Sequence, residues 1–200
     1  MRFIQSRKII LASGSPRRKA YLERYGLRFD VAKAEIEESA LPGEQPLAFS
    51  QRMAEEKADF VIRKYEREGV IIAADTIVVF NGEILGKPAS RDNVLPMLKL
   101  LNGQTHEVIT SYVVSDSLDS RKIRHSVKTD VEFNKLDDSQ LHAYAESNEP
   151  LDKAGAYSIQ GIGTFLVKAI NGSYNNVVGL PIEVLLQDLI SLRVISTITD

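Results

Sequence analysis

The first residues with the chemistry of a binding site are Ser-Gly-Ser-Pro-Arg-Arg at positions 13–18, directly after a short apolar run. Ser15 followed by proline is typical of a helix start, and a helix N-terminus binds anions through its free backbone N–H groups and its dipole. Ser13 adds a hydroxyl donor, and Arg17 and Arg18 add guanidinium groups that bind phosphate bidentately. No Gly-Lys-Ser/Thr follows, so this is not a Walker A loop. The segment indicates a phosphate site; the alternative is a capped helix with two solvated arginines.

An aspartate interrupts an apolar run at Ala-Ala-Asp-Thr-Ile, residues 73–77. A carboxylate in such surroundings is costly unless it is paired, hydrogen-bonded or bound to a metal. Asp75 could therefore activate water or hold a divalent cation, because strand ends in α/β sheets often face ligands. The alternative is a structural carboxylate that accepts backbone N–H bonds in a turn.

Two lysines and a small-residue loop supply further polar groups. Lys87, between glycine and proline, could be a fixed cation for a triphosphate, and Lys57 could act likewise from a long helix. Most lysines, however, are simply solvated. The loop at 152–161 contains Lys153 and also Gln160, whose amide offers a donor and an acceptor to a base edge. Glycine-containing loops of this kind are also common as plain turns.

Other features are better interpreted as structural. His106, His125 and His142 are not spaced as in a zinc motif, so we interpret them as three unrelated histidines. The basic stretch at 121–125 is short and follows aspartates, which favours a solvated face over a nucleic-acid patch.

Composition excludes several classes of protein. The net charge of -2 provides no global positive field for nucleic acid or an anionic membrane. The absence of cysteine excludes disulfides and thiolate metal sites, and fits a reducing cytosol. The N-terminal apolar run is too short for a secretory signal, and no segment approaches the roughly 20 apolar residues that span a bilayer. We therefore expect a soluble cytoplasmic protein without a nucleic-acid or membrane partner.

Helical and extended patterns alternate along the chain, and they must position these residues. The mixture predicts an α/β protein, a single domain over residues 1–200, with a mixed β-sheet flanked by helices. Strand order does not follow from the pattern. Strands are expected at 8–12, 29–34, 70–74, 77–80, 83–85 (after the Asn-Gly hairpin signal), 106–114, 122–133 and 164–170; helices are expected at 16–26, 46–68, 90–101 (kinked at Pro96 or starting later), 137–147 and 181–192.

Taken together, the motifs resemble those of Maf proteins, over roughly Ile9 to Leu192. Five strings occur in the order seen in that family: LASGSPRR from residue 11, ADT from 74, GKP from 86, DKAGAY from 152 and VGLP from 178. Each string is weak by itself, but all five in order are highly specific. Two positions depart from the family pattern, Ser158 in place of an expected glycine and Pro96 within a helix, and both concern local backbone shape.

The resemblance implies a house-cleaning nucleoside triphosphate pyrophosphatase that needs a divalent cation, Mg²⁺ or Mn²⁺. It implies an elongated two-lobed Maf/ITPase-like fold with the substrate in a cleft between the lobes. The DKAGAY string with Gln160 resembles the branch that prefers dTTP and UTP over 7-methyl-GTP. Carried across by motif, catalysis falls to Glu35, Lys57, Asp75 and Lys87, metal binding to Asp75 and Glu35, and substrate binding to Ser13, Ser15, Arg17, Arg18, Thr76, Lys153 and Gln160.

The implied reaction is attack of a metal-associated water on the α-phosphorus, with pyrophosphate leaving. Asp75 is the general base or the ligand that orients the water, and Glu35 is the second carboxylate. The expected partner is a nucleoside triphosphate, and a homodimer is left open. The alternatives are the 7-methyl-GTP branch and a non-catalytic nucleotide- or DNA-binding regulator of septum formation. The missing basic face argues against DNA, and a nucleotide sensor would not need the two carboxylates.

Overall fold

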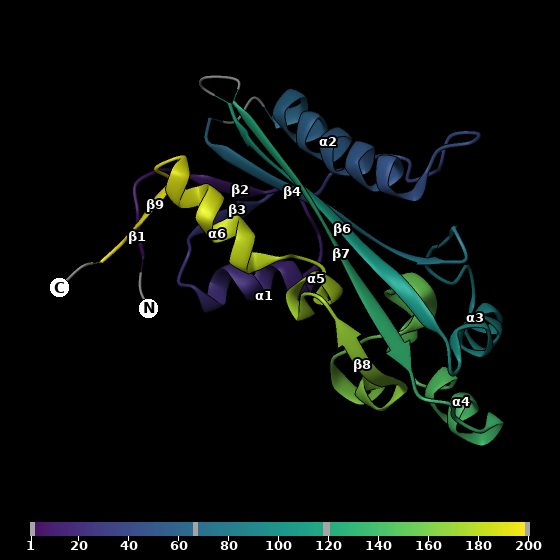
Figure 1. Cartoon of the computed structure of the whole chain (residues 1–200). Helices are drawn as coiled ribbons and strands as arrows, with labels where there is room; N and C mark the ends of the chain where they lie inside the picture. The colour runs from purple at the N-terminus through teal and green to yellow at the C-terminus, as the bar shows by residue number, and fades with distance from the viewer. Residues whose placement is uncertain (1–2, 66–67, 118–120, 199–200) are drawn as a thin grey trace. The chain divides into compact units, whose positions relative to one another are not determined.

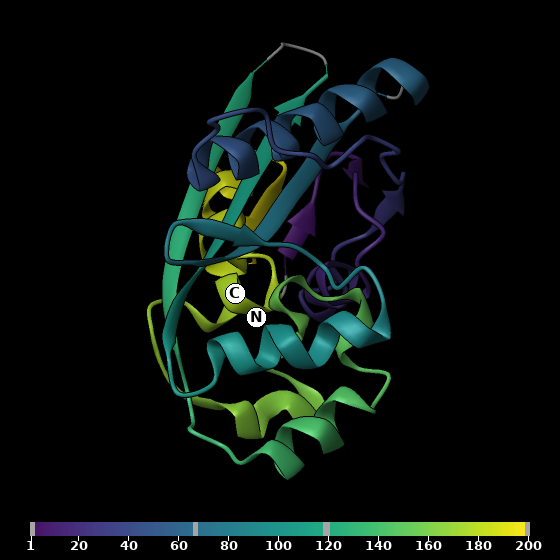
Figure 2. The ribbon, with the colours of Figure 1, turned by 90° about the vertical axis from the view of Figure 1, so that its right-hand side faces the viewer.

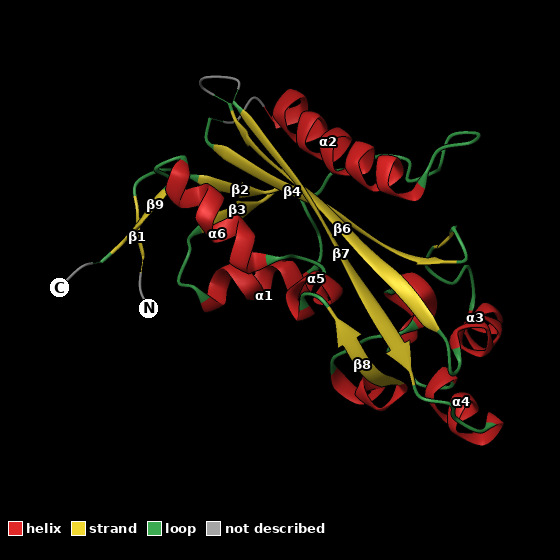
Figure 3. Cartoon of the chain, viewed as in Figure 1, coloured by secondary structure: helices red, strands yellow, loops and turns green. Residues whose placement is uncertain are grey.

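The computed structural model describes residues 3–65, 68–117 and 121–198. It is an α/β protein in which helices flank a mixed sheet, as predicted (Figure 3). Strand neighbours follow the order β3-β2-β4-β6-β7-β8, with β5 paired to β4 and a separate β1-β9 ribbon. The strands are β1 (Phe3–Gln5), β2 (Ile9–Leu11), β3 (Phe29–Val31), β4 (Val70–Phe80), β5 (Glu83–Leu85), β6 (Thr105–Asp116), β7 (Lys122–Phe133), β8 (Val167–Asn171) and β9 (Ile195–Thr197). The helices are α1 (Pro16–Arg24), α2 (Pro46–Tyr65), α3 (Val94–Leu101), α4 (Asp138–Ala145), α5 (Tyr174–Val178) and α6 (Ile182–Ser191).

The chain folds into two compact units. The first comprises Met1–Asp75, Thr110–Ser126 and Gly179–Asp200, and the second comprises Thr76–Ile109 and Val127–Val178. Strands β4, β6 and β7 each contribute residues to both units, and β6 and β7 run side by side in Figures 1 and 2. The elongated two-lobed shape that the resemblance implies, and the cleft between the lobes, stay predictions.

The first unit is built on parallel strands joined by helices. β2 pairs in parallel with both β3 and β4, with Leu11 opposite Ile72, so β2 ends beside the first part of β4, three residues before Asp75. Helix α2 covers one face of these strands, where it packs with Val113 of β6 (Figure 1). Helix α6 lies on the other face, where the Tyr112 hydroxyl of β6 donates to Asp188 at 2.5 Å. Because adjacent strand residues point to opposite faces, β6 contacts both layers.

The second unit has its own core. Its apolar cluster joins β6 and β7 to α3, α4 and the short 3₁₀ turns at residues 150–166. His106 lies inside it, 2% exposed, with its Nε2 2.8 Å from the Tyr157 hydroxyl and its ring packed edge-on against Phe133. The histidine therefore helps to hold the loop that carries the DKAGAY string.

The buried His106 makes the stability of the protein depend on pH. Burial lowers its pKa to about 4, whereas an unfolded histidine binds a proton below about pH 6.5. Stability present above pH 6.5 is therefore lost as the pH falls toward 4. We expect His106→Gln to reduce the loss of unfolding free energy between pH 7 and about 4.5 by roughly 2–3 kcal/mol, measured by urea titration. Equal losses in both proteins would contradict this assignment.

Most expected elements are confirmed, including the later start of the helix that contains Pro96, and three differ. The two strands expected on either side of Asp75 are one continuous strand, β4, because the carboxylate is satisfied by a side-chain partner and does not break the ladder. Residues 164–166 belong to a 3₁₀ segment instead of the expected strand. Helix α3 begins at Val94, which places Pro96 in its first turn, where no hydrogen bond is lost. The short β1, α5 and β9 were not expected, and residues 66 and 67 of the helix expected at 46–68 lie outside the described residues.

Candidate functional site

The segment between β2 and α1 forms a capped helix N-terminus in the first unit. The Ser15 Oγ accepts a bond from the backbone N of Arg18 at 3.5 Å, and Pro16 occupies the first helical position. The backbone N of Ser15 donates to the Ser13 Oγ at 3.2 Å. The two serines therefore shape the turn, and the predicted helix start is confirmed.

Arg18 ties three segments of the first unit together. Its Nε donates to the Gly179 carbonyl at 2.8 Å, and its Nη1 donates to the Ala74 carbonyl at 2.9 Å and to the Ser13 Oγ at 3.1 Å. Ala74 directly precedes Asp75, so the arginine fixes the backbone beside the carboxylate. Its role is partly structural, which the sequence alone could not distinguish from phosphate binding.

The charges around Arg18 form one electrostatic cluster. Burial lowers the pKa of its guanidinium, Asp75 raises it, Arg17 lowers it and Glu38 raises it. Arg18 is thus within electrostatic range of both carboxylates and of Arg17. A site that combines both signs at close range suits a ligand bearing anionic oxygens and a bound cation.

Asp75 and Lys57 form a buried ion pair that also includes Glu38. The Lys57 Nζ lies 2.7 Å from the Asp75 Oδ1 and 2.8 Å from the Glu38 Oε1. The Lys57 and Asp75 side chains are 9% and 8% exposed, and that of Glu38 is 44% exposed. The Asp75 Oδ2 is buried and has no hydrogen-bond partner among the described residues. One carboxylate oxygen is therefore oriented by the lysine, while the other remains available to a ligand.

Close packing of α2 places Lys57 against Asp75. Ala54 and Ala58, the small residues on either side of it in α2, are fully buried against Ile71 and Ala73 of the sheet. Asp75 lies on the same face of β4 as these two sheet residues, because side chains alternate along a strand. The short alanines allow the helix to approach the strand, so that the lysine reaches the carboxylate.

The structure places Glu35 apart from this ion pair. Its carboxylate is 69% exposed and lies 2.9 Å from the Lys64 Nζ, and the hydrogen bond with Lys64 lowers the pKa of Glu35. The carboxylate that shares Lys57 with Asp75 is Glu38, which the sequence analysis missed. Its only sequence signal is the presence of several glutamates in one irregular loop. The predicted roles of Glu35 in catalysis and metal binding stay predictions.

Asp75 and Glu38 fit a divalent cation of the Mg²⁺ type. Such ions are held by one or two carboxylates together with water and substrate phosphates, and the free Oδ2 of Asp75 provides a ligand atom. No cluster of three or more histidine, aspartate or glutamate side chains suited to a metal occurs among residues 3–65, 68–117 and 121–198. Asp75 and Glu38 are therefore the residues that could hold such an ion, with its other ligands coming from outside the protein.

The remaining predicted site residues belong to the second unit. Thr76 follows Asp75 on β4 and faces the opposite side of the strand. Lys87 is exposed in the loop after β5. Lys153 donates to the Glu149 carbonyl at 2.9 Å and pairs with Asp152. The Gln160 side-chain amide makes no hydrogen bond with the described residues, and this residue lines a pocket of about 500 Å³.

Two of the sequence motifs meet in the second unit. The backbone N of Gly155 donates to the Gly86 carbonyl at 3.0 Å, which joins the loop of Lys87 to the DKAGAY loop. Gly155 adopts φ +68°, and a Cβ there would lie 3.0 Å from Val78. A side chain at this position would force the loops apart, which explains a glycine here.

Comparison with known proteins identifies the family. The family model described as "Maf-like protein" matches residues 8–192. The chain belongs to the Maf-like proteins. Among its relatives, the dTTP/UTP pyrophosphatase of Geobacter metallireducens is 45% identical over 185 residues, which cover 92% of this chain and 96% of that protein. The dTTP/UTP pyrophosphatase of Escherichia coli K12 is 44% identical over 174 residues, 87% of each chain.

Among solved structures, one similar to this Maf-like chain is a nucleoside-triphosphatase, dITP/XTP pyrophosphatase, from Mycobacterium abscessus. It has a TM-score of 0.46 and 14% identity, and covers 93% of this chain and 96% of that one. No helix within the described parts of this Maf-like protein is both long and apolar enough to span a bilayer.

The two arginines of the Maf-like motif should differ when replaced. We expect Arg17→Ala and Arg18→Ala each to weaken triphosphate binding by about 1.5–3 kcal/mol, through loss of charge-assisted bonds. Arg18→Ala should also lower the free energy of unfolding by roughly 1–3 kcal/mol, because two carbonyls lose their donor. Calorimetric binding and urea unfolding measure the two effects. Arg24→Ala, at the other end of α1, is the charge-matched control, and unchanged binding in both test variants would contradict the phosphate role.

Proposed function

We propose that this chain hydrolyses dTTP and UTP to the monophosphate and pyrophosphate. The observation that carries the proposal is the buried Asp75 carboxylate, which Lys57 orients through Oδ1 and whose Oδ2 has no hydrogen-bond partner in the described parts of the chain. A merely structural buried carboxylate would be expected to have both oxygens satisfied. The relatives known as dTTP/UTP pyrophosphatases support the substrate and the reaction.

The phosphates bind at the start of α1. The N-terminal N–H groups of the helix and the hydroxyls of Ser13 and Ser15 provide neutral donors, and Arg17 and Arg18 provide cations. Lys87 and Lys153 are the further cations that the sequence motifs assign to the substrate. Phosphoryl transfer depends mainly on positioning and on stabilising charge at the phosphate oxygens, which these groups supply.

Asp75 acts either as the general base or as the ligand that orients the attacking water. A water molecule attacks the α-phosphorus, its proton passes to the Asp75 Oδ2 in the first case and to solvent in the second, and the bond from the α-phosphorus to the bridging oxygen breaks to release pyrophosphate. Lys57 holds the Oδ1 so that the carboxylate keeps one orientation. Glu38, on the other side of Lys57, is the second carboxylate of the site.

A bound Mg²⁺ or Mn²⁺ would be held by Asp75 and Glu38. Glu35 is the second ligand that the family resemblance implies. The ion would neutralise negative charge on the phosphates. The cation requirement is part of the proposal. Removal of divalent cations with a chelator should abolish turnover, and activity that persists would contradict it.

Base recognition is assigned to Gln160, with Thr76 beside the nucleoside. An amide donor and acceptor match the imide edge that uracil and thymine share, while cytosine reverses the pattern at that edge. Unpaired polar groups in a tightly built site can discriminate by about 10⁴-fold.

A nucleotide panel tests the proposal. We expect kcat/KM, measured by pyrophosphate release, to be highest for dTTP and UTP and lower for CTP, ATP, GTP and 7-methyl-GTP. If kcat/KM is highest for 7-methyl-GTP, the chain is still a pyrophosphatase, but its assignment to the dTTP/UTP branch of the family is wrong. If no nucleotide is hydrolysed although several bind, the chain is a nucleotide-binding regulator and the enzymatic proposal fails.

A further inference from the structure

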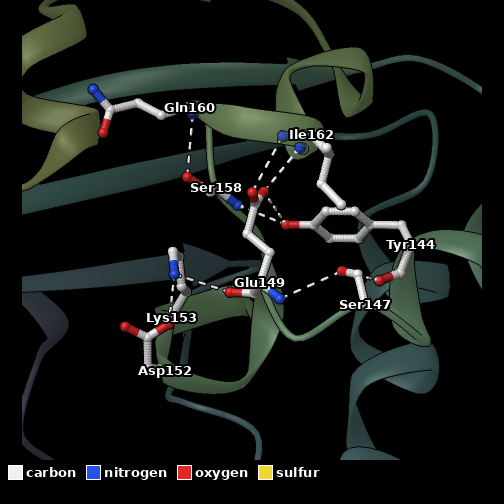
Figure 4. A network of polar contacts seen from close by, with 9 residues as sticks. Tyr144, Ser147, Glu149, Asp152, Lys153, Ser158, Gln160 and Ile162 are labelled. Carbon is white, nitrogen blue, oxygen red and sulfur yellow. Dashed lines mark hydrogen bonds and ion pairs between the residues drawn. The ribbon is translucent and has the colours of Figure 1, made fainter.

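The carboxylate of Glu149 lies at the centre of a polar network in the second unit (Figure 4). Its Oε1 accepts from the backbone N of Gly163 at 2.8 Å and from the Tyr144 hydroxyl at 3.0 Å, and its Oε2 accepts from the backbone N of Ile162 at 3.1 Å. Two consecutive backbone N–H groups that converge on one anion form an anion-binding nest. Here the anion is a side chain of the protein itself.

Two glycines beside this carboxylate, Gly161 and Gly163, lie too close to their neighbours to carry a side chain. A Cβ on Gly161 would lie 2.3 Å from the Glu149 Oε2, and φ +68° at this position is one that other residues rarely adopt. A Cβ on Gly163 would lie 2.4 Å from the Ser158 carbonyl and 2.9 Å from the Glu149 Oε1. The two glycines therefore let the loop close tightly around the carboxylate.

The same network reaches the residues on either side of Gln160. The Tyr144 hydroxyl accepts from the backbone N of Ser158 at 3.1 Å while it donates to Glu149, and the Ser158 Oγ accepts from the backbone N of Gln160 at 3.1 Å. Burial and the neighbouring Glu149 carboxylate both raise the pKa of Tyr144, which keeps the hydroxyl protonated. Figure 4 shows the Gln160 side chain extending away from this network. The backbone of Gln160 is thus held from both sides, and its amide is left for a ligand.

We propose that Glu149, together with Tyr144, is a positioning residue for base selection: it holds the 158–163 loop in the one conformation that presents the Gln160 amide to the pyrimidine. This inference rests on the proposed function, because it assigns the base to Gln160. Glu149 touches neither phosphate nor base in this scheme. Its removal should therefore lower selectivity for the base and leave the phosphate contacts unchanged.

Glu149→Gln is the sharpest test, because the amide keeps the size of the side chain and removes one of the two acceptors that the loop needs. We expect the ratio of kcat/KM for UTP to that for CTP to fall by about 10- to 100-fold, mainly through a higher KM for UTP. Inhibition by inorganic tripolyphosphate, which has no base, should be unchanged. Glu146→Gln is the matched control, since Glu146 is exposed on the same segment and its side chain makes no bond recorded among the described residues.

A double-mutant cycle with Gln160→Ala separates the possible outcomes. If Glu149 acts through Gln160, the change Glu149→Gln should alter the UTP-to-CTP ratio by less than about twofold when Gln160 is already alanine. If the UTP-to-CTP ratio falls in Gln160→Ala but not in Glu149→Gln, the positioning role of Glu149 is overturned, while the assignment of the base to Gln160 stands. A ratio unaffected by Gln160→Ala would contradict the assignment of the base to Gln160, and equal losses for UTP and tripolyphosphate would show a general structural effect.

Tyr144→Phe provides the same test if the glutamine variant does not fold. It removes only the hydroxyl that links Glu149 to the Ser158 backbone. We expect a fall in the UTP-to-CTP ratio of about 10-fold, again with unchanged inhibition by tripolyphosphate. An unchanged ratio in a folded Tyr144→Phe protein would overturn the proposal.

Discussion

Replacing Asp75 with asparagine is expected to lower kcat for dTTP by about 10²–10⁴-fold, the usual effect of losing a general base. The amide can still accept the Lys57 bond at the position of Oδ1. At the position of Oδ2 it presents an NH₂ group, which cannot take a proton from water. The triphosphate contacts at α1 do not depend on this atom, so nucleotide affinity should be nearly retained.

Steady-state kinetics and calorimetric binding on the same preparation measure the two effects of Asp75→Asn. Asp59→Asn is the matched control, because Asp59 also pairs with a lysine, Lys122, and lies on the exposed side of α2. Near-normal turnover in Asp75→Asn would remove the general base from the mechanism. A large loss of affinity with unchanged kcat would instead indicate that Asp75 mainly binds the substrate or its cation.

Replacing Lys57 with methionine is expected to lower the free energy of unfolding by about 3–5 kcal/mol, because it leaves a buried carboxylate without its partner. The side chains of Lys57 and Asp75 are both nearly inaccessible to solvent. Among the described residues, the second oxygen of Asp75, Oδ2, has no hydrogen-bond partner. Turnover should also fall, since the carboxylate loses the contact that orients it. Methionine preserves most of the side-chain length, which limits the packing change.

The double variant Lys57→Met with Asp75→Asn distinguishes charge from packing. It removes both members of the buried pair, so its stability should exceed that of Lys57→Met alone, while its activity should stay lost. Urea unfolding of the four proteins in the cycle gives the interaction energy. Strictly additive losses of stability would show that the two side chains are not coupled, and would contradict the buried ion pair as the basis of the effect.

The local sequence determined most of the helices and strands, and it determined the helix start at Ser15 and Pro16 that belongs to the candidate site. Ser15 and Pro16 specify a helix start because capping and a fixed φ act within a few residues, and α1 begins there. The Asn-Gly turn after β4 likewise predicts its own hairpin, because it needs only the positive φ values that these residues tolerate. Periodicity identified the long helix α2, although not which of its polar residues would be buried.

Only the tertiary structure decided which polar groups meet. The loop after β3 contains Glu35, Glu37 and Glu38, and no periodicity in an irregular segment distinguishes their directions. Glu38 shares Lys57 with Asp75 because α2 packs closely on the sheet through its alanines, a contact between segments distant in sequence. Glu149 is a further example: nothing in its neighbours predicts that its carboxylate is enclosed by backbone N–H groups 13 and 14 residues away. Capping and turns are local interactions, and the sequence encodes them directly, whereas the pairing of charges depends on long-range packing that the pattern does not contain.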